Sequence, residues 1–273
     1  SNPSRRNYDV GLNLVKKSLD ALIKYKADNR SGYLSYEDAF EVVESAVSKF
    51  IDAKGFINDL VAEGVLSKNL YWTDSNEYKD GIYFAYERFE DHLTVQYLLE
   101  QYLDLDNEFK EGGKLYHYVE NENKIYFNKG IIEAFSIQVP EINGRELFEY
   151  LPSLKGSYPI VVAFVESLLW RKAETIGEGL KPYINEHVFS YEGTYDLFWE
   201  AIISVTAIPN HYFNANRLHE KLMQDSFAER DSQWTVLLKN KYSDESSVKR
   251  LIDWSWSSID KSHISDSSIK LSA

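Results

Sequence analysis

The sequence predicts a mainly α-helical protein, in which a winged-helix-like domain is followed by an α-helical, repeat-like domain. Apolar residues recur at helical spacing between residues 11 and 62, and two segments rich in β-branched and aromatic residues follow. Helical spacing then returns from Glu87 onwards. Since 273 residues exceed the usual size of one domain, we expect two packed units, residues 1–104 and 105–273.

Three helices are expected in the first unit. Residues 11–25 carry an apolar face at helical spacing, which predicts the first helix. Ser35, with Asp38 three residues later, is a variant of the capping box and predicts the start of the second. The third is expected over 49–62, with Gly64 as its C-terminal stop.

A β-hairpin is expected after these helices. Residues 65–73 and 81–87 are predicted strands, and the polar residues 74–81 between them supply a turn. The turn predicts a long, acidic hairpin tip, in which Asp74, Glu77 and Asp80 outnumber Lys79. Three helices followed by a hairpin is the order of a winged-helix module.

The second unit is expected to be helical. Residues 104–128 carry no clear period, and residues 124–130 are interpreted as a short extended piece. Helices are then predicted at 130–138, 144–151, 158–172, 192–206, 214–224, 230–240 and 246–256. Prolines such as Pro140 stand between or at the edges of these elements, and the succession of short helices suggests a stacked α-solenoid.

The composition narrows the class of protein. The chain has no cysteine, which rules out disulfides and thiolate metal ligands and fits a reducing cytoplasm. No run of eighteen apolar residues occurs, so no membrane segment is expected. The net charge is −13 and the basic residues do not cluster, which disfavours a nucleic-acid partner.

Motifs that carry chemistry are missing from the sequence. It contains no P-loop, no G-x-S-x-G nucleophile elbow and no H-E-x-x-H pair. None of the six histidines pairs with another at metal-ligand spacing. We therefore expect no catalytic residue, no metal site and no cofactor in this chain, and we do not expect it to be an enzyme.

Residues 81–100 resemble a motif of bacterial STAND NTPases, the signal-transduction ATPases with numerous domains. An aromatic strand there leads into an apolar helix through Tyr86, Glu87, Arg88, Phe89, Asp91, His92 and Leu93. Further pieces similar to this family follow in the same order at 57–69, 130–141, 213–242 and 248–256. The resemblance covers residues 11–256, and it includes antiviral members of the family.

The resemblance implies that the chain is a piece of a longer signalling protein. It would hold the winged helix and the start of a helical sensor arm, without the N-terminal ATPase domain that binds ATP or ADP with Mg²⁺. The partners implied are that ATPase domain, an unknown protein trigger and further copies of the parent in an oligomer. Such proteins switch between two states, since nucleotide and trigger favour opposite arrangements of one interface.

The family motif supplies the candidate switch residues, which are Tyr86, Glu87, Arg88, Phe89, Asp91 and His92. We expect Arg88 to be shielded between Tyr86 and Phe89 and to pin the strand-to-helix corner; the alternative is a local ion pair with Glu87 at the helix start. His92 is a candidate for contact with the ATPase domain or its nucleotide, and the alternative is a local hydrogen bond.

The sequence leaves two alternative functions, a DNA-binding regulator and an enzyme. A DNA-binding winged-helix regulator would place its third helix in the major groove. That segment, residues 48–64, balances Lys49 and Lys54 against three acidic residues, which are Asp52, Asp59 and Glu63. A winged helix used for protein contact is therefore favoured. An enzyme of unrecognised type, working in a cleft between the two units, has no residue in its favour.

Overall fold

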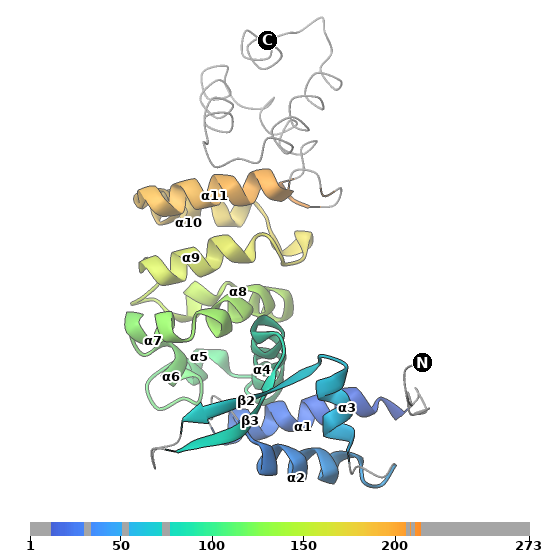
Figure 1. The fold of residues 1–273 in the computed structure, drawn as a ribbon. Helices are drawn as coiled ribbons and strands as arrows, with labels where there is room; N and C mark the ends of the chain where they lie inside the picture. Colours follow the sequence, from blue (N-terminus) through green and yellow to red (C-terminus); the bar gives the residue numbers. More distant parts are fainter. Residues whose placement is uncertain are drawn as a thin grey trace, which may run out of the picture. The chain divides into compact units, whose positions relative to one another are not determined.

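A computed structural model describes residues 12–29, 34–50, 55–72, 77–205, 208 and 211–213 (Figure 1). Contacts divide the chain into two compact units with the boundary between Leu105 and Asp106. This boundary lies one residue from the one expected. The prediction of a mainly α-helical protein is confirmed, since the described residues form mostly helices and one small antiparallel sheet. Within the described residues, no helix is long and apolar enough to cross a membrane.

The first unit contains the three helices, the hairpin and the helix that starts at Glu87, in the predicted order. The elements are α1 (Leu14–Asn29), β1 (Leu34–Ser35), α2 (Tyr36–Val47), α3 (Phe56–Ala62), β2 (Leu66–Trp72), β3 (Tyr78–Phe84) and α4 (Glu87–Gln101). The strands form an antiparallel sheet in the order β1-β3-β2. β1 was not predicted, because two residues are too few to show an alternating pattern.

Two predicted helix boundaries are confirmed by their hydrogen bonds. The Ser35 hydroxyl accepts from the Asp38 amide at 3.0 Å and caps α2. After α3, Gly64 adopts a left-handed conformation with φ of +70°. Its amide donates to the Val61 carbonyl, and the Val65 amide donates to the Leu60 carbonyl. These two bonds make a Schellman motif, which ends α3 where the sequence indicated.

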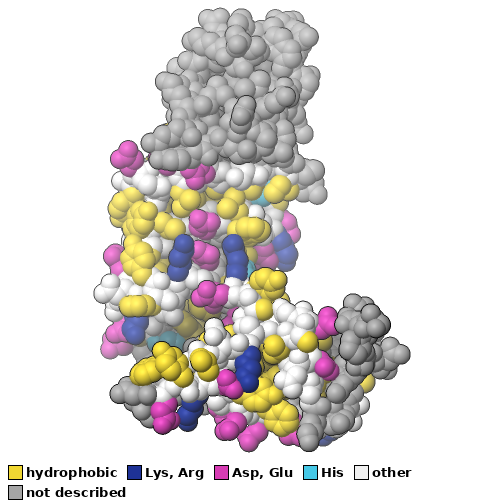
Figure 2. Space-filling model, viewed as in Figure 1, with side chains coloured by type: hydrophobic (Ala, Val, Ile, Leu, Met, Phe, Trp, Pro, Cys, Tyr) yellow, Lys and Arg dark blue, Asp and Glu magenta, His cyan; other side chains and the backbone are white. Residues whose placement is uncertain are grey.

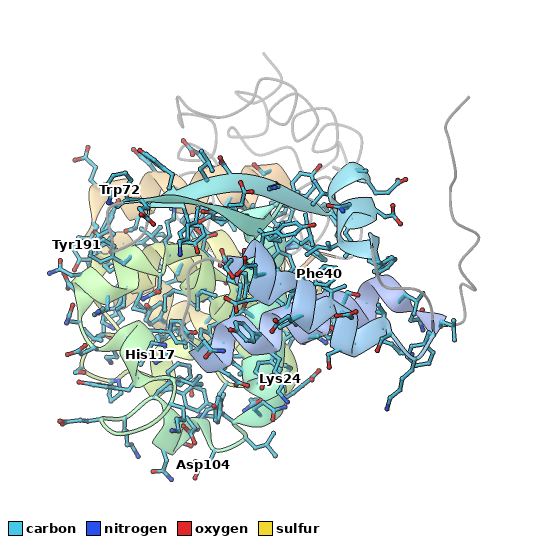
Figure 3. The ribbon with its side chains drawn as sticks, turned by 60° about the horizontal axis from the view of Figure 1, so that its bottom comes forward. Lys24, Phe40, Trp72, Asp104, His117 and Tyr191 are labelled. Atoms are coloured by element: carbon cyan, nitrogen blue, oxygen red, sulfur yellow. The ribbon has the colours of Figure 1, made fainter. Side chains whose placement is uncertain are left out.

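The hairpin extends further toward its tip than expected. β3 begins at Tyr78, which lies opposite Trp72 with the ring centroids 4.6 Å apart. Asp80 is therefore a strand residue, and it pairs with Lys68 across the ladder at 2.8 Å. The prediction of a turn over 74–81 was wrong for 78–81, because cross-strand pairs hold these polar residues in the sheet. Asp74 lies outside the described residues, and Figure 3 labels Trp72, the last residue of β2.

One apolar core joins the helices and the sheet of the first unit. Its largest fully buried side chains are those of Leu22, Ile23, Leu34, Phe56, Ile57, Leu66 and Ile82. Since α1, α2, α3 and the sheet all contribute, the strand-to-helix corner between β3 and α4 rests on a packed base.

The second unit is helical throughout its described part. Its elements, beginning at the boundary, are α5 (Leu105–Glu108), α6 (Tyr116–Val119), α7 (Glu122–Phe127), α8 (Lys129–Asn143), η2 (Leu147–Tyr150), α9 (Tyr158–Ser167), η3 (Ala173–Thr175), η4 (Glu178–Leu180), α10 (Lys181–Glu186), η5 (Val188–Ser190) and α11 (Glu192–Val205). Here η marks a 3₁₀ turn. α8, α9 and α11 lie in successive layers (Figure 1).

The prediction of an extended piece at 124–130 is wrong. Asn121 accepts a hydrogen bond from the Lys124 amide at 3.1 Å and caps α7, which buries Ile125. Three β-branched or aromatic residues in a short run did not outweigh a capped helix start. The next helix also differs, because α8 runs through Pro140 to Asn143 and ends at Gly144, whose φ is +69°.

Other helices of the second unit differ from the prediction in their bounds, or were not predicted. The helix predicted at 192–206 is confirmed as α11, while α9 ends at Ser167 rather than at 172. The segment predicted as a helix at 144–151 forms only the 3₁₀ turn η2, and α10 was not predicted. The helices predicted at 214–224, 230–240 and 246–256 lie outside the described residues.

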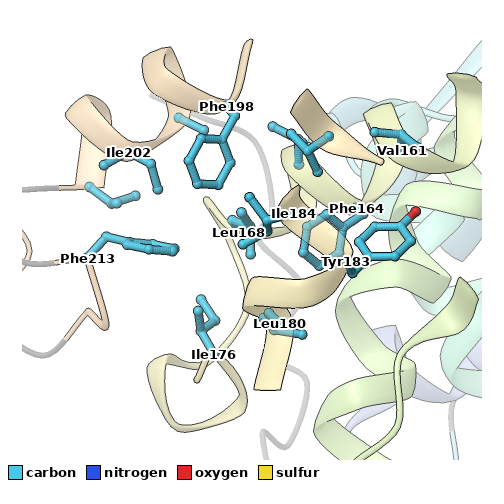
Figure 4. Packing of buried hydrophobic residues seen from close by; sticks show 14 residues of the cluster. Val161, Phe164, Leu168, Ile176, Leu180, Tyr183, Ile184, Phe198, Ile202 and Phe213 are labelled. Atoms are coloured by element: carbon cyan, nitrogen blue, oxygen red, sulfur yellow. The ribbon is translucent and has the colours of Figure 1, made fainter. Parts of the chain in front are cut away.

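Aromatic rings pack among aliphatic side chains in a core cluster of the second unit. Figure 4 shows Phe164 beside Tyr183, with Phe198 and Ile202 contributed by α11. Tyr183 stacks on Phe148 at a centroid distance of 3.6 Å, and its hydroxyl donates to the Lys155 carbonyl at 2.6 Å. Stacking and a satisfied hydroxyl together fix this ring in the core.

Because the Tyr183 hydroxyl is buried, we expect the protein to lose stability at alkaline pH. Burial, assisted by the charge of Glu146, raises the pKa of Tyr183 above its ordinary value of 10.0. The unfolded chain releases this proton near the ordinary pKa while the folded chain keeps it. The free energy of unfolding therefore falls as pH rises above about 10, by up to about 1.4 kcal/mol per pH unit.

Urea unfolding at several pH values above about 9 measures this effect. Tyr183→Phe should flatten the alkaline slope, and Tyr158→Phe, at an exposed tyrosine, is the matched control. Equal slopes in the two variants would contradict the assignment.

Candidate functional site

The residues of the family motif lie at the corner where β3 leads into α4. Tyr86 precedes the first turn of α4, and its side chain is 71% exposed. Glu87 and Arg88 are exposed, Phe89 is 43% exposed, and Asp91 and His92 are half-buried. Two aromatic rings therefore face solvent at this corner, beside charges of both signs. Exposed aromatic side chains of this kind are typical of protein contact sites.

Arg88 is not shielded. The expectation that Tyr86 and Phe89 cover it is wrong, because all three side chains are exposed. Tyr86 is the N-cap of α4, and Glu87 and Arg88 follow in its first turn with exposed side chains.

An exposed Arg88 predicts a small effect on stability. Arg88→Ala should change the free energy of unfolding by no more than about 0.5 kcal/mol, as exposed ion pairs usually do. Urea unfolding of the two proteins measures the difference. A loss of about 2 kcal/mol or more would instead support the pinned corner.

A partly buried ion pair links α1 to α4 beside the corner. The Lys26 ammonium contacts a Glu90 carboxylate oxygen, with side-chain exposures of 7% and 19%. The same ammonium lies 6.0 Å from the centre of the Phe84 ring. Glu90 stands within the family motif, between Phe89 and Asp91, yet it was not singled out from the sequence. The available signal was Lys26 itself, which continues the apolar face of Leu19, Leu22 and Ile23.

A groove opens beside the exposed aromatic residues of the motif. It has a volume of about 610 Å³ and lies between α1, α3 and α4. Its apolar walls are Leu14, Val15, Leu19, Phe56, Phe89 and Leu93. Phe89 and Leu93 therefore connect the exposed corner with an apolar surface of the same unit, which suits a protein segment better than a charged ligand.

The surfaces that would read DNA carry little positive charge. The seven residues of α3 include Asp59 and no lysine or arginine. On the hairpin, Lys68 is paired with Asp80, and its ammonium also lies 4.8 Å from the centre of the Tyr36 ring. On the face visible in Figure 2, the lysine and arginine side chains of the described residues are scattered among acidic and apolar ones. Phosphate binding favours the opposite arrangement.

The second unit contains a buried ion pair that the sequence did not reveal. Arg171 donates to the two carboxylate oxygens of Glu146 at 2.7 and 2.8 Å, and the side chains are 0% and 8% exposed. Burial raises the pKa of Glu146 above its ordinary value in spite of this pairing. The pair ties the segment before η2 to the segment after α9. Because this contact is bidentate and lines neither groove nor pocket of the described residues, we interpret it as a structural brace between these two segments.

Two histidines of the described residues make hydrogen bonds to backbone atoms. His211 is buried; its Nε2 lies 2.8 Å from the Leu168 carbonyl oxygen, and its Nδ1 accepts from the Phe213 amide. His117 bonds the Lys114 carbonyl within its own turn. Among the residues that the structure describes, no group of three or more His, Asp or Glu side chains is placed to hold a metal ion.

Comparison with protein-family models, with curated proteins and with solved structures found no match for this chain. The pieces that resemble STAND NTPases at 57–69, 81–100 and 130–141 lie largely within the described residues. Those at 213–242 and 248–256 lie outside them, apart from Phe213.

Proposed function

We propose that this chain is a regulatory and sensing region of a STAND-type signalling ATPase. In this role it acts through contacts with other domains and proteins, and its own residues catalyse no reaction. The parent protein would supply an N-terminal ATPase domain that binds ATP or ADP with Mg²⁺. Oligomer formation by the parent, a protein trigger, a cytoplasmic location and a part in antiviral defence belong to the same proposal.

The strand-to-helix corner at residues 86–93 is the observation that carries this proposal. A contact that must form and release needs exposed groups on a rigid support, because mobile groups lose more entropy on binding. Tyr86 and Phe89 are exposed, while the buried pair between Lys26 and Glu90 fixes the helix that bears them. The corner therefore combines an accessible surface with a fixed geometry.

The winged-helix class belongs to the proposal as well. The order of one helix, a short strand, two helices and a hairpin supports it, since the short strand completes the hairpin's sheet. The absence of lysine and arginine from α3 favours protein contact over DNA binding. A DNA-binding regulator would need a basic surface on this helix or on the hairpin.

Two experiments test the proposal. The coding sequence upstream of residue 1 should contain a strand, a P-loop and a helix; a different upstream domain would refute the ATPase assignment. In this chain, Tyr86→Ala with Phe89→Ala should weaken binding of the parent's separately produced ATPase domain at least about tenfold, or about 1.4 kcal/mol. Tyr126→Ala, at an exposed tyrosine of the second unit, is the control. Unchanged binding would exclude the corner as the contact.

A further inference from the structure

The strand β2 forms one edge of the sheet in the first unit. β3 lies between β1 and β2, so one side of β2 pairs with no strand of the described residues. Lys68, Asn69 and Leu70, in the middle of this strand, are exposed. The backbone amide and carbonyl groups of an exposed edge can pair with a further strand.

The hydrogen bonds of the hairpin show which residues of β2 face this edge. The Ala85 amide donates to the Val65 carbonyl, which makes these two residues a hydrogen-bonded pair. The register then continues without interruption from Leu66 to Trp72, and the two kinds of pair alternate along an antiparallel ladder. The even-numbered residues of β2 therefore point their backbone groups away from β3. In agreement with this, the Leu70 amide donates to the Asn69 side chain at 2.9 Å.

Large apolar side chains are exposed on the same part of β2. Leu70 and Trp72 are exposed, and the Trp72 ring contacts Tyr78 of β3, which is also exposed. Because side chains alternate along a strand, Leu70 and Trp72 lie on the same face as the buried Leu66. The apolar face of the sheet thus continues beyond the core of the unit.

The sequence of β2 is complementary to itself. The strand contains Lys68 and none of the chain's acidic residues. When two β2 strands pair in antiparallel fashion about a twofold axis at Leu70, the two Leu70 side chains lie opposite each other. Lys68 then lies opposite Trp72 of the second copy, whose ring attracts a cation. A twofold axis at Lys68 would instead set two like charges opposite each other, which is unfavourable.

We propose that two copies of this chain associate through their β2 strands, in an antiparallel pair centred on Leu70. The Leu70 amide exchanges its bond to Asn69 for a bond to the Leu70 carbonyl of the second copy, and the two sheets become one. One strand from each copy makes a small contact beside a standard interface of about 1,600 Å², so the dimer is reversible. The inference does not rest on the proposed function, because it uses only the hairpin of this chain.

Sedimentation of the full chain at increasing concentration should show a monomer–dimer equilibrium. Leu70→Lys sets two ammonium groups opposite each other and should raise the Kd of the dimer at least about tenfold. The pairing of β2 with β3 is kept, because the Leu70 backbone faces away from β3. Ile142→Lys, in α8, is the control, since it adds the same charge at an apolar residue that is 60% exposed, against 56% for Leu70. A chain that stays monomeric up to about 1 mM, or equal Kd values for the two variants, would overturn the inference.

Engineered cysteines test the register, since the chain has no cysteine of its own. Leu70→Cys should give a disulfide-linked dimer when diamide is added, because directly opposite residues lie within disulfide reach. Asn69→Cys is the control, since Asn69 lies opposite Tyr71 of the second copy. Two cysteines at this position exceed the Cα separation of about 7 Å that a disulfide spans, and they should cross-link at least about tenfold more slowly. Cross-linking at position 69 as fast as at position 70 would contradict the pairing.

Hydrogen exchange distinguishes pairing at the sheet edge from a contact made by side chains alone. The Lys68 and Leu70 amides should exchange more slowly as the concentration of the chain rises. The Ser67 and Asn69 amides face β3 and should be equally protected at every concentration. A dimer that leaves exchange at Lys68 and Leu70 unchanged would rule out the edge as the contact. These measurements use this chain alone, so their failure leaves the proposed contact with the ATPase domain untouched.

Discussion

Replacing Arg171 with alanine is expected to lower the free energy of unfolding of the second unit by about 3–5 kcal/mol. Arg171 and Glu146 form a bidentate pair with both side chains almost fully out of water. Removing the guanidinium leaves a carboxylate that neither water nor another cation solvates well. The loss should appear as faster hydrogen exchange in α8 and α9 and as a lower urea midpoint.

Variants of the partner distinguish lost charge from lost packing. Burial raises the pKa of Glu146, so this site disfavours the charged carboxylate. Glu146→Gln should therefore cost less than Arg171→Ala, because a neutral amide still accepts from the guanidinium. The double variant Glu146→Leu with Arg171→Met should recover most of the stability that Arg171→Ala loses. If Arg171→Ala costs less than about 1 kcal/mol, the brace is not a stabilising element of the fold.

The sequence indicated those parts of the fold that depend on local chemistry. Ser35 caps α2 and Gly64 ends α3 as predicted, because each acts through atoms within a few residues. The error at 124–130 arose where two local signals competed. The run of Ile125, Tyr126 and Phe127 suggested a strand, while the cap at Asn121 favoured the helix that forms.

The candidate site shows the limit of such prediction. Tyr86 and Glu87 are exposed at the start of α4, where the prediction was a shielded corner. The partner of Glu90 is 64 residues away in the sequence, and no pattern in the sequence joins it to Lys26. The prediction that Arg88 is shielded rested on its place between two aromatic residues in the sequence. Only the packing of α1 against α4 shows which charge is buried.

The second large effect on stability is expected from replacing Lys26. Lys26→Ala should lower the free energy of unfolding of the first unit by about 2–3 kcal/mol. This lies below the value for a fully buried pair, because Glu90 keeps a fifth of its side-chain surface in water. Glu90, with 19% of its side chain exposed, would then be left without its ammonium partner. Lys26→Met should cost less than alanine, since it keeps the aliphatic packing of the side chain.

The chain offers a matched control for this prediction on the same helix. Lys16 also pairs with a carboxylate, Asp20, at 2.7 Å, but both side chains are exposed. Lys16→Ala should therefore cost no more than about 0.5 kcal/mol. Urea unfolding compares the two variants, and hydrogen exchange in the first turn of α4 shows whether the corner at Tyr86 loosens. Equal costs for Lys16→Ala and Lys26→Ala would mean that burial adds nothing to the pair, and that the corner is held by apolar packing alone.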